Sequence, residues 1–123
     1  MIAEEEFHRV IMLERKNAER TRKPFLLMLL DVGGCIPPDK DGKVPETVVS
    51  AISGFTSDTD VAGWYKKNSV LGVMFREFEP EDRNTVLSAM MTRVSETLRK
   101  SLSEHQFSEM QISFHLFPEE WNH

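Results

Sequence analysis

The chain has 123 residues, of which 40% are hydrophobic and 28% are charged, and its formal net charge is −5 at pH 7. This length is enough to bury one hydrophobic core, so we expect a single domain over residues 1–123. The acidic balance argues against nucleic-acid binding, which requires a clustered excess of Lys and Arg. The apolar run Phe25 to Leu30 is far shorter than the roughly 18 residues of a membrane span, so we expect no membrane insertion.

The cysteine content and the N-terminus predict a cytoplasmic protein. Cys35 is the single cysteine, so it forms no internal disulfide and builds no zinc site by itself. The acidic run Glu4 to Glu6 stands where a secretory signal would be basic.

The chain begins with a predicted amphipathic helix. From Glu4 to about Thr21, Phe7, Val10 and Ile11 recur at helical spacing among charged residues. We therefore expect a leading helix within residues 1–22.

A buried strand and a second helix follow. The run Phe25 to Val32 comes after Pro24, and its unbroken apolarity predicts a central strand that is covered on both faces. Glycines and prolines then predict a loop. A second helix is expected to begin near Pro45-Glu46 and to end around Gly54, because proline is tolerated in a first helical turn.

Two short β-prone segments predict a tight hairpin. Val61 to Tyr65 and Val70 to Phe75 are separated by four polar residues. These tip residues are Lys66, Lys67, Asn68 and Ser69.

A long helix and a last strand complete the predicted elements. Glu79-Pro80 is a strong helix start, and an apolar stripe continues from Val86 to Leu102. Apolar and polar residues then alternate from Met110 to Leu116, which predicts a strand with one buried face, ended by Pro118.

The order of these elements predicts an α+β fold. Strand, helix, strand, strand, helix, strand is the ferredoxin-like βαββαβ plan, an antiparallel sheet with both helices on one face. We expect this core over residues 24–118, with the first and last strands near the middle of the sheet. The leading helix precedes the core, and residues 119–123 form a tail.

Several segments, in the same order, resemble the GGDEF domain of diguanylate cyclases. Residues 13–25 resemble that family's leading helix and basic turn, and residues 27–32 resemble its first strand. Residues 58–65 resemble the approach to its signature hairpin, and residues 111–118 resemble a later strand. The resemblance implies that Asp31 stands where active members hold a magnesium ion.

The hairpin departs from the pattern of active members. They carry a Gly-Gly-acid-acid-Phe turn, in which glycines let the backbone approach phosphates and acids bind metal. Here the tip carries Lys66, Lys67, Asn68 and Ser69, so Asp31 lacks the carboxylates that two-metal phosphoryl chemistry requires. We expect no catalytic residue, no metal and no cofactor.

Two further ligand positions of the family also differ. The loop after Asp31 reads Gly33-Gly34-Cys35-Ile36-Pro37-Pro38, without the residues that help hold guanine. The family's product-inhibition motif is Arg-x-x-Asp, and the equivalent positions here are Ser57 and Asp60. Because the arginine is missing, we expect no cyclic-di-GMP binding by that route, and nucleotide binding in general is not favoured.

The other chemistry-bearing residues give no site. The four histidines share no metal-ligand spacing, and Asp39-Lys40-Asp41-Gly42 lacks the later acids of a calcium loop. Cys35 is interpreted as an ordinary loop thiol. A small basic patch that includes Arg15 and Lys16 is interleaved with glutamates, so it is interpreted as a solvated helix face.

These observations predict a catalytically inactive GGDEF-like regulatory or protein-interaction module of bacterial signalling. Phe7, Val10 and Ile11 are candidate contacts with a protein partner or with a second copy, and Trp121 of the tail is another. Three alternatives remain: an active nucleotidyl cyclase or transferase with non-standard metal ligands, a nucleotide sensor without turnover, and a structural ferredoxin-like adaptor.

Overall fold

The computed structural model describes residues 2–33, 46–55, 60–67, 69–76, 83–101 and 104–117. The helices and strands within these residues are α1 (Glu4–Thr21), β1 (Phe25–Asp31), α2 (Glu46–Phe55), β2 (Val61–Lys66), β3 (Val70–Phe75), α3 (Arg83–Ser101), α4 (Glu104–Ser108) and β4 (Gln111–Phe117). Each element that the sequence predicts is present with similar bounds. The short helix α4 was not predicted. In the described residues, no helix combines the length and the apolarity that crossing a membrane requires.

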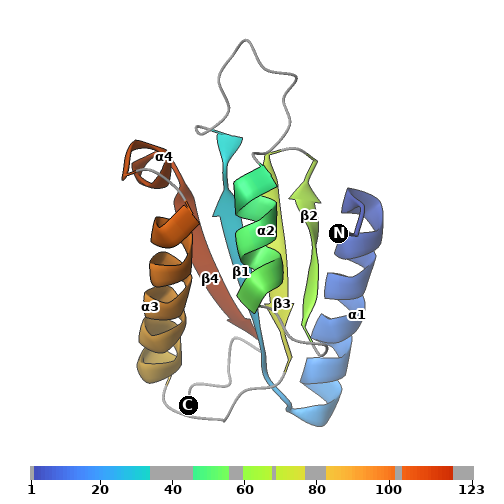
Figure 1. Ribbon diagram of the computed structural model, residues 1–123. Coiled ribbons are helices and arrows are strands. Elements are labelled where there is room, and N and C mark those ends of the chain that lie inside the picture. Colours follow the sequence, from blue (N-terminus) through green and yellow to red (C-terminus); the bar gives the residue numbers. More distant parts are fainter. Residues whose placement is uncertain are drawn as a thin grey trace.

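The four strands form an antiparallel sheet in the order β2-β3-β1-β4. With α2 and α3 packed on one face, this arrangement confirms the ferredoxin-like α+β fold (Figure 1). The prediction for the last strand is wrong, because β4 lies at an edge and β3 takes the second central position. The two strands that each helix connects are separated by one other strand in the sheet. Strand β3 therefore lies between β2 and β1, and β1 lies between β3 and β4.

Strand β1 is central and has apolar residues on both faces, as its sequence predicts. Leu26, Met28 and Leu30 are fully buried in the core that the sheet forms with α2 and α3. Phe25 and Leu27 face the opposite side, where they pack with α1. The sheet therefore separates two cores, and α1 supplies the second one.

Local sequence explains where α1 begins and ends. Its first turn contains Glu4, Glu5 and Glu6, whose charges favour the positive end of the helix dipole. At the other end, Arg22 adopts the left-handed conformation, with φ 62°, and its backbone N–H donates to the Ala18 carbonyl at 2.8 Å. Pro24 follows and prevents the helix from continuing.

Helix α1 is fixed to the sheet by Phe7, whose side chain is fully buried. Its ring lies on Gly63 of β2 and Gly72 of β3, which pair with each other across the hairpin. A Cβ atom added at Gly63 would lie 2.6 Å from Phe7 Cδ1, closer than atoms can approach. The two glycines thus create the space that lets α1 dock on this sheet face.

The burial of α1 corrects the predicted partner contacts. Phe7 is 0% exposed and Ile11 is 8% exposed, because both pack within the chain's own second core. The prediction that they contact a partner is therefore wrong. Val10 is half-buried against the same core. The apolar side chains that α1 exposes are instead Met12 and Leu13.

Candidate functional site

The structure places Asp31 beside the hairpin turn. Asp31 ends β1, where it pairs with Val70 of β3 on one side and Gln111 of β4 on the other. The next backbone N–H, that of Val32, donates to the Ser69 carbonyl at 2.8 Å. The position that the family resemblance assigns to metal binding therefore adjoins the hairpin tip. The carboxylate of Asp31 is exposed, and its Oδ1 accepts a hydrogen bond from the Gly33 N–H at 3.0 Å.

The tip itself presents lysines at the positions where the resemblance implies carboxylates. Lys66 and Lys67 are exposed, and Ser69 closes the turn by donating its backbone N–H to the Lys66 carbonyl at 3.0 Å. Asn68 lies outside the described residues. Within those residues, no three His, Cys, Asp or Glu side chains gather closely enough to hold a metal ion.

The N-terminal segment forms hydrogen bonds with the hairpin. The backbone N–H of Lys67 donates to Glu4 Oε1 at 2.5 Å. Ile2 pairs with β2 by donating to the Ala62 carbonyl at 3.2 Å and accepting from the Trp64 N–H at 2.9 Å. Sequence patterns do not predict these contacts, because Glu4 and Lys67 are 63 positions apart.

His8 strengthens the same connection. Its Nε2 lies 2.6 Å from the Tyr65 carbonyl oxygen, which accepts a hydrogen bond from the ring, and the His8 and Tyr65 ring centroids are 4.5 Å apart. The His8 ring therefore has its own partner within the fold. His115 also has a local partner, since its Nε2 lies 3.2 Å from Ser113 Oγ.

We expect Glu4→Ala to loosen the hairpin tip, because it removes the acceptor of the Lys67 N–H. Lys67 should exchange its amide hydrogen faster, with a stability loss of about 0.5–1.5 kcal/mol, the usual range for one hydrogen bond. Hydrogen exchange followed by NMR measures the first effect, and urea unfolding measures the second. Glu5→Ala is the matched control, since it removes the same charge from the first helical turn. Equal amide exchange rates of Lys67 in the two variants would contradict the assignment of Glu4 as the acceptor of its N–H.

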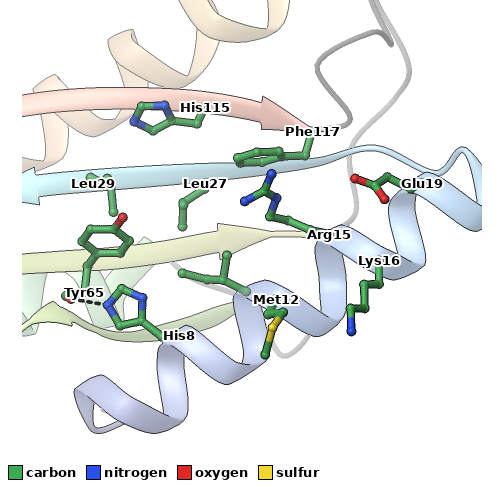
Figure 2. Close-up of a pocket in the computed structure, with 11 residues that line it drawn as sticks. His8, Met12, Arg15, Lys16, Glu19, Leu27, Leu29, Tyr65, His115 and Phe117 are labelled. Atoms are coloured by element: carbon green, nitrogen blue, oxygen red, sulfur yellow. Dashed lines mark hydrogen bonds between the residues drawn. The ribbon is translucent and has the colours of Figure 1, made fainter.

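A groove lies on the sheet face that α1 covers only in part, and we name it the α1–β4 groove (Figure 2). Its volume is about 550 Å³. Helix α1 forms one wall, with His8, Ile11, Met12, Arg15, Lys16 and Glu19. The three strands that complete it contribute Leu27, Leu29, Tyr65, His115 and Phe117.

Arg15 crosses one end of the groove. Figure 2 shows its side chain extending from α1 toward Phe117 of β4, and its Cζ lies 5.1 Å from the centroid of the Phe117 ring. Such a contact between a guanidinium and an aromatic face is attractive. Thus Arg15, which the sequence analysis assigned to a solvated face, has a defined position in a groove.

Of the remaining predicted site residues, Asp60 is the one that the described part of the chain includes. Asp60 is half-buried just before β2, whereas Ser57 and Trp121 lie outside the described residues. The same holds for Cys35 and for Asp39 to Gly42. Their predicted roles stay predictions.

Comparisons with known proteins identify the fold. No family model and no curated protein sequence matches the chain. The structure is similar to the crystal structure of a DGC (diguanylate cyclase) protein from Thermotoga maritima, with a TM-score of 0.64 and 11% sequence identity. The match covers 100% of this chain and 86% of that one. The chain therefore has a GGDEF-like fold, as the resemblance implied.

Proposed function

We propose that the chain is a catalytically inactive GGDEF-like domain that acts in bacterial signalling by regulating or binding another protein. The observation that carries the proposal is the position of Asp31, which pairs with Val70 beside a hairpin tip that contains Lys66 and Lys67. Magnesium binds hard oxygen ligands, and two-metal phosphoryl transfer needs carboxylates from both segments. Ammonium groups at the tip repel divalent cations instead.

The contacts of the tip support the same conclusion. The Lys67 N–H is occupied by Glu4, and Asp31 Oδ1 accepts from Gly33. Binding of a phosphate by the Lys67 N–H would first require that its hydrogen bond to Glu4 breaks. We infer that the hairpin has a structural role, in which it receives the N-terminal helix.

One observation favours a second candidate, an active nucleotidyl cyclase or transferase with non-standard ligands. Glu4 brings a carboxylate from α1 to the hairpin tip. If Glu4 left Lys67, it would supply a second acid near the end of β1. This alternative makes both Asp31 and Glu4 essential.

A turnover assay separates the two candidates. We expect the purified chain to form no product from GTP or ATP in the presence of Mg²⁺ or Mn²⁺, as measured by chromatography of the nucleotides. Asp31→Asn and Glu4→Gln should leave this result unchanged. Product that is formed by the unmodified chain and by Glu5→Gln, but lost in both other variants, would establish the enzyme instead. Calorimetric binding of a nucleotide without turnover would indicate a sensor.

A further inference from the structure

Helix α1 leaves part of its sheet face uncovered. It docks over the hairpin, where Phe7 lies on Gly63 and Gly72, and Figure 1 shows it alongside β2, away from β4. On the β4 side of the same face, Ser113 and His115 are exposed. The α1–β4 groove occupies the space between the helix and this strand.

The dimensions of the groove suit a short helix. Along α1 it extends from His8 to Glu19, which corresponds to about 16 Å, or about three turns, at the rise of an α-helix. It is partly open to solvent. Small-molecule sites generally enclose most of their ligand, whereas a helix that lies in a groove buries only one face.

An apolar strip lines the groove between its two walls. Leu27 and Leu29 form the floor, and Met12, which is 52% exposed, lies on the α1 side (Figure 2). Methionine adapts its shape to different apolar partners, and it is common on surfaces that receive helices. The strip therefore accepts the apolar face of an amphipathic segment.

The charges on the α1 wall favour an acidic occupant. Arg15 and Lys16 both line the groove and are exposed, in a chain whose net charge is −5. Among the described residues, neither cation forms a salt bridge. Glu19 is the acidic residue on this wall, one turn beyond Arg15. Opposite charge at the rim of an interface steers association and selects the partner.

We propose that the α1–β4 groove binds an acidic amphipathic helix of a partner protein. The helix places apolar side chains, spaced three or four residues apart, on Leu27, Leu29 and Met12, and its carboxylates meet Arg15 and Lys16. This inference rests on the proposed function as an interaction module, and it names the surface and the chemistry of the partner.

The test uses the full chain and two synthetic helical peptides of about 14 residues, matched in their leucine positions. One carries glutamates at its polar positions and the other carries lysines. Fluorescence anisotropy measures affinity, and NMR identifies the perturbed residues. We expect the acidic peptide to bind at least tenfold more tightly and to shift the signals of Leu27, Leu29 and His115.

Charge-reversed variants locate the binding site. Arg15→Glu combined with Lys16→Glu should weaken binding of the acidic peptide at least tenfold. Arg93→Glu combined with Lys100→Glu makes the same charge change at exposed positions of α3, and it should have little effect. Met12→Asp should also weaken binding, because it places a carboxylate on the apolar strip. Circular dichroism confirms that each variant is folded.

Other outcomes would overturn the proposal. These are equal affinity for the two peptides, no binding of either, or equal effects of the α1 and α3 variants. Decanoate that binds in the groove in place of the peptide would make it a small-molecule site. Self-association that is lost in the α1 variant would make the occupant a second copy. Nucleotide turnover overturns the proposed function alone, so the two failures are distinguishable.

Discussion

Replacing Gly72 with alanine is expected to lower the free energy of unfolding by about 1–3 kcal/mol, the usual cost of overpacking a core. The new Cβ would lie 2.8 Å from Phe7 Cζ. Phe7 is fully buried between α1 and the sheet, so its ring has no free space in which to move. Urea unfolding measures the loss, and we expect the hydrogen exchange of α1 to accelerate as the helix is displaced.

A double-mutant cycle tests whether the Phe7 ring is the cause. Phe7→Ala should by itself cost about 3–5 kcal/mol, because a large aromatic side chain leaves a cavity. In that background Gly72→Ala should cost almost nothing, since the atoms that it would contact are gone. Strict additivity of the two losses would show that the cost at Gly72 arises elsewhere.

Gly54 provides the matched glycine control. A Cβ added there meets nothing within 4 Å, and the residue lies inside α2. Alanine is the better helix former, so Gly54→Ala should raise stability by up to about 1 kcal/mol. The same substitution is therefore expected to lower the free energy of unfolding at Gly72 and to raise it at Gly54.

The second large effect is expected at Leu30. Its side chain is fully buried on the central strand, where the residue pairs with Leu71 of β3 and Ile112 of β4. Leu30→Ala removes three carbon atoms from a site that cannot collapse easily, at a cost of about 2–5 kcal/mol. Because domains of this size are stable by only about 5–15 kcal/mol, a large share of the stability would be lost. Thermal and urea unfolding measure this change.

Leu13→Ala is the chemically identical control. Leu13 is 59% exposed on α1, so its truncation leaves no cavity. We expect a change within about 0.5 kcal/mol, the range of ordinary surface substitutions. Comparable losses for Leu13→Ala and Leu30→Ala would contradict the assignment of Leu30 to the core.

The periodicity of apolar residues was sufficient to predict most of the elements and the fold class. The run that ends at Leu30 indicated a strand covered on both faces, and the structure confirms it. The spacing of apolar residues could not decide whether each one contacts the chain's own sheet or a partner protein. Phe7 and Ile11 have the same pattern whether α1 packs on its own sheet or on a partner, and the sheet proved to be their contact.

The close approach of α1 was also hidden in the sequence. Gly63 and Gly72 read as ordinary strand residues, and their role emerges only when the hairpin pairs them under Phe7. The other contacts that could not be predicted join residues that are far apart in the sequence. Glu4 meets Lys67 because α1 packs against the hairpin, and Arg15 meets Phe117 because its long side chain extends from α1 to β4. Asp31 was predictable as a strand end, and its position beside the hairpin followed from the topology.

Helix α1 contacts the hairpin tip and also forms a wall of the α1–β4 groove. One of its sides holds the hairpin through Glu4 and His8, and another forms the wall of the groove through Met12 and Arg15. Thermodynamic linkage requires that a ligand which distinguishes two positions of this helix shifts the balance between them, whichever surface it occupies. A partner that binds α1 in the groove would then also change the stability of the contacts between α1 and the lysine-containing turn. Binding at one surface would in this way affect the other surface through the helix.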